Sequence, residues 1–104
     1  MPFETIDWSR FPEERNPGER GTASSRTYRS GPIRVRMVEY SAGYRADHWC
    51  PKGHIVLCVR GEFTSEHQDG SSHRIRTGMT YIVGEGMTPH RSSSEAGATL
   101  FIVD

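Results

Sequence analysis

The sequence predicts an all-β fold, a sandwich or barrel built from short strands. Apolar and polar residues alternate with a period of two in several stretches, and turn residues such as Gly, Pro, Asp and Ser separate these stretches at short intervals. No segment sustains the 3.6-residue periodicity of an amphipathic helix. We therefore expect some eight or nine short strands, arranged as a sandwich or a closed barrel.

The 104 residues are enough for a single domain with one core. Residues 1–21 are polar, contain three prolines and show no helical stripe, so we expect an extended N-terminal arm whose aromatic side chains dock elsewhere, for example on a neighbouring subunit. Residues 22–104 are expected to form the barrel. Hydrophobic residues make up only 34% of the chain, which suggests either a modest core or one completed by a partner subunit.

The expected strands follow one another through the barrel segment. Residues 22–29 alternate loosely and end at a Ser-Gly-Pro turn, whereas residues 33–40 alternate clearly. Asp69-Gly70 is a strong signal for a β-hairpin between the two strands that flank it. The remaining predicted strands are residues 46–50, 55–60, 62–67, 72–76, 79–83 and 99–103.

Charge and composition argue against several classes of partner. The formal net charge is zero, so the chain lacks the basic surface expected of a protein that binds nucleic acid or an anionic membrane. No apolar run is long enough to span a bilayer, the first residues do not resemble a signal peptide, and we expect a cytoplasmic location. Two cysteines are too few for a disulfide framework, so they are expected to be free thiols, a metal ligand, or both.

One short stretch carries the residues best suited to chemistry. His48 and Cys50 are two apart, so on an extended chain their side chains point to the same face. His54 follows a turn-like Pro-Lys-Gly insert, and His90 could supply a fourth ligand from much later in the chain. Imidazole and thiolate are ligands of zinc and, less exclusively, of iron, copper and nickel. The sequence therefore predicts a metal site.

The spacing of these residues resembles the first sequence motif of the cupin superfamily. That motif is a Gly, then His-x-His, then Glu, then a further Gly, and its layout is matched by Gly43, His48, Cys50, His54 and Gly61. Cys50 stands where the motif has its second His, and His54 stands where it has Glu.

The second cupin motif is also recognisable. Gly78, Gly84, Gly86 and His90 resemble it, with Gly84 in place of a Pro and one extra residue before the His. More narrowly, most of the chain from Trp8 onward is similar to small cupins named for an Asp-His-Cys-Trp motif, which here is Asp47-His48-Trp49-Cys50.

The resemblance implies a double-stranded β-helix, a jelly-roll barrel with a metal inside one open end. Carried over position by position, the ligands are His48, Cys50, His54 and His90. The resemblance also implies a homodimer. Because a thiolate and an imidazole replace the usual imidazole and carboxylate, the expected cofactor is a divalent transition metal, zinc first, with nickel, copper or iron as alternatives.

Three further residues are candidates for binding a substrate. Arg36 and Tyr40 share one face of the strand at 33–40, together with Arg34, and they could hold an anionic small molecule beside the metal if that face lines the barrel. Alternatively, the apolar face of the same strand points inward and the arginines are solvated. Tyr81 could reach the mouth of the barrel, whereas His67 and His73 flank the predicted hairpin and are expected to be solvated.

Two functions of different class remain open at this point. A metalloenzyme would keep an open coordination position and act on a small polar or carboxylate-bearing molecule. Tyr40 and Tyr81 are the candidate bases, but the sequence identifies no catalytic residue. The alternative is a non-catalytic module that binds a small molecule or senses metal or redox state, with a closed structural zinc site. The number of protein ligands distinguishes the two.

Overall fold

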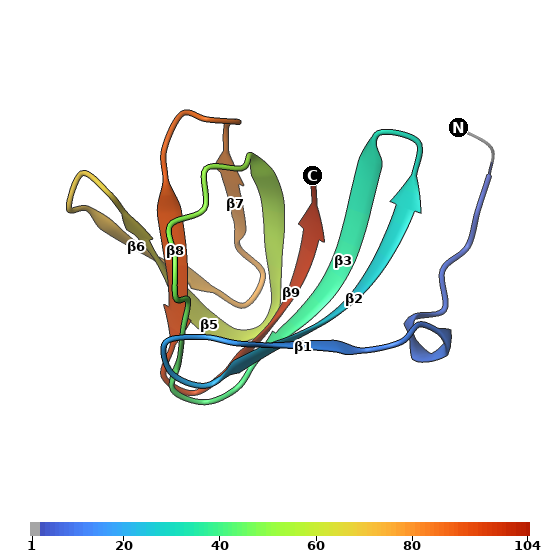
Figure 1. Cartoon of the computed structure of the whole chain (residues 1–104), viewed down its shortest axis with the longest axis horizontal. Coiled ribbons are helices and arrows are strands. Elements are labelled where there is room, and N and C mark those ends of the chain that lie inside the picture. The colour runs from blue at the N-terminus through green and yellow to red at the C-terminus, as the bar shows by residue number, and fades with distance from the viewer. Residues whose placement is uncertain (1–2) are drawn as a thin grey trace.

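The computed structural model describes residues 3–104, which form nine strands and one short 3₁₀ helix, η1 (Trp8–Arg10) (Figure 1). No helix within these residues has the length and apolar character needed to cross a membrane. The strands are β1 (Glu14–Pro17), β2 (Thr22–Ser30), β3 (Ile33–Tyr40), β4 (Tyr44–Arg45), β5 (His54–His67), β6 (Ser72–Arg76), β7 (Thr80–Val83), β8 (His90–Ser94) and β9 (Ala98–Val103).

The strands form one antiparallel sheet that curls into an open barrel. The hydrogen-bonded order is β1-β2-β3-β9-β5-β8-β4, and β6 and β7 also pair with β5. Figure 1 shows β8 and β3 on opposite sides of the interior, joined through β5 and β9. The predicted all-β fold and the predicted number of strands are therefore confirmed over the described residues.

The central strand β5 is a single bent strand where the sequence predicted two, at residues 55–60 and 62–67. Its first half pairs with β7 and β9, and its second half pairs with β6 and β8. The bend lies at Gly61, whose φ of 78° is favourable only for glycine, and a Cβ there would lie 2.3 Å from the carbonyl oxygen of Gly97. Glycine thus lets one strand serve both walls of the barrel.

A register shift just before the bend changes which β5 side chains face the interior. The pairing with β9 slips between Cys58 and Arg60, which is the behaviour of a β-bulge. Even-numbered Val56 and Cys58 are buried before the shift, whereas odd-numbered Phe63 and Ser65 are buried after it. A one-residue slip exchanges the two faces of a strand, so the second half of β5 presents the opposite parity to the barrel.

The prediction of a strand at residues 46–50 is wrong. β4 ends at Arg45, and within 46–50 only Cys50 makes an isolated bridge, to His90. The side chain of Asp47 bonds to His48 outside any ladder, and Pro51, which has no N–H to donate, follows directly. The segment is therefore an irregular connection that hydrogen-bonds to β8 at its two ends, from Ala46 to Ser92 and between Cys50 and His90.

Other predicted elements are confirmed closely. β3 has the predicted bounds of residues 33–40, and the hairpin around Asp69-Gly70 joins the end of β5 to β6. The inner face of β3 carries Arg34, Arg36 and Tyr40, which line a cavity together with residues of β5, β8 and β9. The interpretation with the arginines inside the barrel is therefore correct, and the apolar face of β3 points outward.

The core is small and lies at the closed end of the barrel. It combines residues from β3, β5, β6 and β9, namely Val38, Val56, Cys58, Phe63, Ile75, Ala98, Leu100 and Ile102. The thiol of Cys58 is fully buried and lies 3.4 Å from the carbonyl oxygen of Gly61, so this cysteine packs as a small core residue.

The predicted N-terminal arm packs on its own chain. β1 pairs with β2, which places residues 14–17 in the sheet, and Phe11 packs edge-on against Tyr28. Arg26 donates to the carbonyl oxygens of Trp8 and Phe11, at 3.1 Å and 2.6 Å. Phe11 thus docks against β2 with Trp8 beside it, whereas Phe3 is 92% exposed. Residues 1–2 lie outside the described part of the chain.

Candidate metal centre

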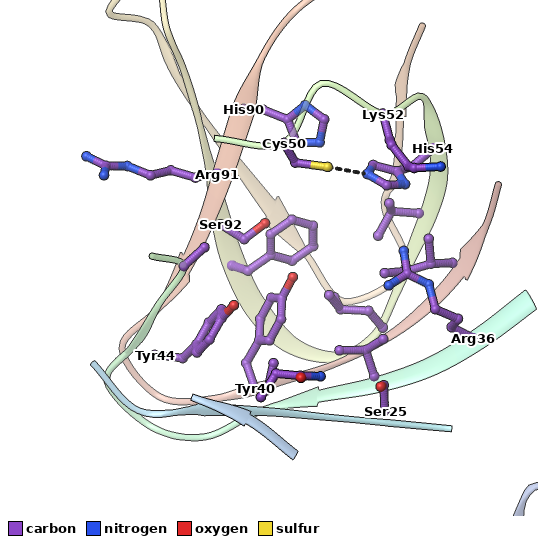
Figure 2. A pocket seen from close by; sticks show the side chains of 18 of the residues that line it. Ser25, Arg36, Tyr40, Tyr44, Cys50, Lys52, His54, His90, Arg91 and Ser92 are labelled. Atoms are coloured by element: carbon purple, nitrogen blue, oxygen red, sulfur yellow. Dashed lines mark hydrogen bonds between the residues drawn. The ribbon is translucent and has the colours of Figure 1, made fainter. Parts of the chain in front are cut away.

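A cavity of about 280 Å³ occupies the interior of the barrel and opens at the end opposite the core (Figure 2). The three residues predicted to bind substrate, Arg36, Tyr40 and Tyr81, all line it. Apolar side chains of the core form its floor, and titratable side chains gather towards its mouth. The cavity is large enough for a small molecule and offers it both apolar and polar contacts.

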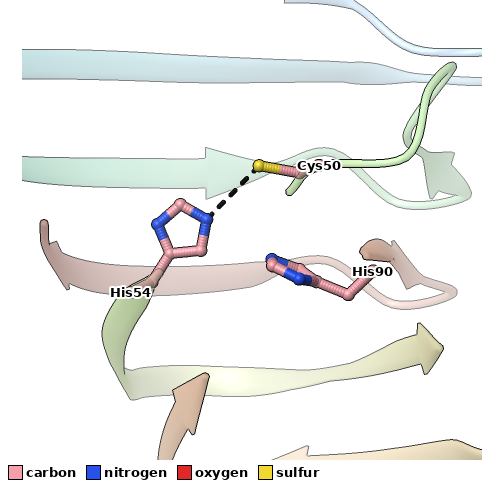
Figure 3. A group of neighbouring side chains, drawn as sticks. All are labelled: Cys50, His54 and His90. Carbon is pink, nitrogen blue, oxygen red and sulfur yellow. Dashed lines mark hydrogen bonds between the residues drawn. The ribbon is translucent and has the colours of Figure 1, made fainter. Parts of the chain in front are cut away.

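Three of the four predicted ligands converge at one side of this cavity. Cys50, His54 and His90 come from the loop before β5, the first residue of β5 and the first residue of β8 (Figure 3). Their candidate ligand atoms all lie within 4.8 Å of one another, and Cys50 Sγ is 3.5 Å from His54 Nε2. A single ion could therefore contact all three.

Two local features of the backbone hold these side chains together. The amide of Cys50 donates to the carbonyl of His90 at 2.7 Å, and the amide of His90 returns the bond at 3.1 Å, so the two residues are fixed side by side. Gly53 lets the chain pass close to residues 84–86, because a Cβ there would lie 2.6 Å from the amide nitrogen of Glu85. This close approach positions the start of β5, and with it His54.

Each of the two histidines is oriented by a hydrogen-bond acceptor at Nδ1, the ring nitrogen that points away from the cluster. His54 Nδ1 lies 2.7 Å from Asp104 Oδ2, and His90 Nδ1 lies 2.9 Å from the carbonyl oxygen of Thr88. Because both acceptors take the proton on Nδ1, each imidazole is fixed from behind and turns its Nε2 towards the cluster, where Nε2 can share a proton with Cys50 or, without that proton, bind a metal. His54 and Asp104 are nearly buried, with side chains 10% and 7% exposed, so water competes little for this bond.

The electrostatics of the cluster favour a thiolate. Hydrogen bonding from His54, and secondarily from His90, lowers the pKa of Cys50 to about 5. The same contact with Cys50 raises the pKa of His90. A thiolate is therefore available at neutral pH, and a metal ion would replace the proton that Cys50 and the imidazoles otherwise share.

Asp104 also joins this cluster to the arginines of β3. Burial raises the pKa of Asp104, but hydrogen bonds from Arg34 and His54 and the charge of Arg36 outweigh burial and leave that pKa well below its ordinary range. The carboxylate is thus charged throughout the physiological range and can support His54 as its acceptor.

His48 is the predicted ligand that the structure does not bring into the cluster. Its side chain is 76% exposed, and its Nδ1 lies 2.6 Å from the carboxylate of Asp47. It contributes to the lining at the mouth of the cavity. Because residues 46–50 do not form a regular strand, the two-residue spacing does not bring His48 into the cluster with Cys50.

The donor set fits a transition metal. One thiolate and two imidazoles are ligands that zinc prefers, and a zinc ion held by three protein ligands would have a coordination position available for a further ligand, as in catalytic zinc sites. The cluster of Cys50, His54 and His90 is thus a suitable divalent metal site.

Two groups of residues beside the cluster were not predicted. The first is the ion pair between Arg34 on β3 and Asp104 directly after β9. The residue pattern gives no signal for a contact between positions so far apart in the sequence. His67 was expected to be solvated, yet its Nε2 lies 2.6 Å from the hydroxyl of Tyr81, which also accepts a bond from Ser65. Only the register shift in β5 explains this inward position, and the sequence does not reveal the shift.

Comparison with known proteins supports the fold. No family model matches the sequence, and neither does any curated protein. Among solved structures, the chain is similar to a protein from Silicibacter pomeroyi that is described as a sugar phosphate isomerase from a cupin superfamily. The TM-score is 0.74, and the identity is 17% over 96% of this chain and 74% of that one. A cupin 2 conserved barrel domain protein from Salinispora arenicola gives a TM-score of 0.70 at 12% identity, over 99% of this chain and 87% of that one.

A further similar structure is the ectoine synthase of P. lautus, with a TM-score of 0.65 and 20% identity over 78% of this chain and 62% of that one. At these identities the likeness concerns the fold and not the activity. It extends over nearly the whole chain and agrees with the curled antiparallel sheet described above. The chain therefore has the jelly-roll barrel fold of the cupin superfamily.

Proposed function

We propose that this barrel binds one divalent transition metal through Cys50, His54 and His90 and acts as a metalloenzyme on a small polar molecule. The observation that carries the proposal is the convergence of the three ligand atoms, with both imidazoles oriented from behind. The cavity beside them gives a small molecule access to the open coordination position.

Zinc is the metal that the donor set favours. A thiolate is a soft ligand and imidazole is a borderline one, and the set contains no carboxylate of the kind that favours magnesium or manganese. Copper, nickel and iron are compatible with the same donors and are alternatives that direct analysis would identify.

The bound metal would polarise a carbonyl or carboxylate oxygen of the substrate, which suits isomerisation, lyase or hydrolytic chemistry. The chain itself supplies the walls: Tyr40 and Tyr81 present phenol groups to the cavity, and Arg36 presents a guanidinium. Two proteins with similar folds, the isomerase and the synthase described above, are enzymes by name, which supports catalysis on this scaffold.

A non-catalytic metal module is the second candidate. Cys50 is deprotonated near neutral pH, which favours oxidation as well as metal binding, so a redox-sensing role is chemically possible. His48 is close enough along the chain to test as a fourth ligand, and a closed four-ligand site would be structural.

Metal content tests the proposal. We expect mass spectrometry of tag-free protein, purified anaerobically, to give near one equivalent of metal for the native chain and a large loss for Cys50→Ser and His90→Ala. His73→Ala is the matched control, because His73 is an exposed histidine outside the cluster, and it should retain the metal. A native protein that binds no metal even after reconstitution would rule the site out.

The coordination number separates the two candidates. We expect His48→Ala to keep the full metal content and affinity, because the His48 side chain points to solvent. X-ray absorption of the metal-loaded protein should then show three protein ligands and one exchangeable position. Loss of metal in His48→Ala, together with a four-ligand spectrum, would favour the structural or sensing module instead.

A further inference from the structure

Two arginines on the inner face of β3 share a single carboxylate. Arg34 binds Asp104 with two parallel hydrogen bonds, Nε to Oδ1 and Nη2 to Oδ2, both at 2.8 Å. Arg36 reaches the same Oδ2 through Nη2 alone, at 3.1 Å. Because the one carboxylate of Asp104 serves both guanidinium groups, the positive charge of Arg36 is only partly balanced by it.

Arg36 is also short of hydrogen-bond acceptors. Its Nε is buried and has no partner within the described part of the chain, although the side chain as a whole is 21% exposed. Burial, followed by the charge of Arg34, lowers the pKa of Arg36, but guanidinium groups remain protonated in proteins. A buried donor without an acceptor is costly and leaves the guanidinium group with fewer acceptors than donors, so an anion at its terminal nitrogens would stabilise the charged side chain.

Arg36 borders the cavity with its terminal nitrogens. Figure 2 shows its terminal nitrogens pointing into the pocket, on the same side as His54 and below Lys52. Arg36, Lys52 and the metal ligands line the same cavity. A ligand that contacts the terminal nitrogens of Arg36 would therefore lie in the space that also borders the cluster of Cys50, His54 and His90.

We propose that Arg36 binds a carboxylate group of the substrate whose other end reaches the metal centre, an inference that rests on the proposed function. The planar guanidinium edge matches the two oxygens of a carboxylate. A dianionic phosphate carries a second negative charge, and Asp104, which lies 3.1 Å from Arg36 Nη2, disfavours that charge more than the single charge of a carboxylate. The apolar floor, which includes Val38 and Ile102, suits a short hydrocarbon body between the two polar ends.

Titration calorimetry on zinc-loaded protein tests this proposal with acetate, pyruvate and succinate as carboxylate probes. Inorganic phosphate and the neutral amide succinamide serve as comparison ligands. We expect at least one carboxylate to bind with a Kd below about 10 mM, and succinamide not to bind. Arg36→Gln should weaken that binding by about tenfold or more, because a charge-assisted bond is lost.

Controls separate the arginine from general charge and from folding. Arg76→Gln removes one positive charge from the exposed face of β6 and should bind the carboxylate within about twofold of the native protein. Arg36→Lys keeps the charge without the planar edge and should fall between native and Arg36→Gln. Circular dichroism and zinc content of each variant show that the barrel and the metal site are intact.

The outcomes also distinguish this proposal from the proposed function. Full zinc content in Arg36→Gln with unchanged carboxylate affinity would overturn the role of Arg36 and leave the metal site standing. Tighter binding of phosphate than of any carboxylate, equal binding of succinamide, or no binding by any of the three carboxylates would also overturn it. If the native protein binds no zinc, the same titration on the metal-free protein still tests the arginine.

Discussion

At the scale of single residues, Asp104 links the parts of the site. Its Oδ2 accepts a hydrogen bond from His54 and another from Arg36, while Oδ1 accepts from Arg34. The carboxylate therefore orients a metal ligand and fixes the arginines of β3 with the same two oxygens. Its side chain is almost fully buried, so removing its charge leaves buried cationic donors without a counter-ion.

This arrangement predicts a pH-dependent loss of stability in Asp104→Asn. The unfolding free energy of the metal-free variant at neutral pH should be lower than that of the native protein by about 3 kcal/mol, measured by urea unfolding. The folded-state pKa of Asp104 is depressed, so its contribution is present above the unfolded pKa of roughly 3.9 and is lost as pH falls through the folded value. The difference between variant and native should therefore shrink below about pH 4.

Asp69→Asn is the matched control for this measurement. Asp69 lies in the exposed hairpin turn and accepts from the amide and hydroxyl of Ser71, bonds that an asparagine oxygen can also accept. This variant should stay within about 0.5 kcal/mol of the native protein. An Asp104→Asn variant as stable as the control at neutral pH would show that the network contributes little.

At the scale of single elements, the bend in β5 is the feature on which the barrel depends. We expect Gly61→Ala to lower the free energy of unfolding by about 3 kcal/mol or more, because a Cβ would clash with Gly97 and the positive φ disfavours any side chain. Gly70→Ala is a control with a positive φ of 96° but open space around the added methyl, and should cost only about 1 kcal/mol. Equal losses in the two variants would mean that backbone conformation alone matters.

The same strand shows how far the sequence could predict the fold. Residues 33–40 alternate clearly, and the Asp69-Gly70 turn has a specific residue signature, so both elements were predicted with accurate bounds. The bulge before Gly61 has no comparable signature, because its position depends on the pairing of β5 with β9. As a consequence the contact between His67 and Tyr81 was missed.

The metal site was predicted only in part, and the reason is related. Cys50, His54 and His90 were identified by their chemistry and their spacing, and the structure brings them together. His48 was placed with them on the assumption of a regular strand at 46–50, which the chain does not form. Spacing in the sequence fixes which face a side chain occupies only where the backbone is regular.

At the scale of the whole molecule, the barrel has an unusual distribution of polar and apolar side chains. Its interior carries two arginines and the metal cluster, whereas the outer surface of the sheet is apolar across four neighbouring strands. Cross-strand pairs on that outer face include Val35 with Val103, Met37 with Phe101, and Ile55 with Ile82. Ile55 and Ile82 are 49% and 72% exposed, and contiguous apolar patches of this kind mark protein interfaces.

We therefore expect a homodimer that packs these outer faces together, which would also complete the small core of each chain. Sedimentation of the native protein should give a dimer, with a melting temperature that rises with concentration. Ile82→Glu should shift it to a monomer, because the charge would be buried within the interface. Met87→Glu is the control: Met87 is 78% exposed but lies in the loop after β7, outside the strands of the sheet, and should leave the dimer intact.

The effect on stability adds an independent criterion. In a monomer, Ile82 is an exposed side chain, and its replacement would change the unfolding free energy by no more than about 0.5 kcal/mol at any concentration. In a dimer, the same change removes interface energy, so the melting temperature of Ile82→Glu should fall below that of the native protein and lose its concentration dependence. A native protein that sediments as a monomer at about 100 µM, with a melting temperature independent of concentration, would contradict the dimer.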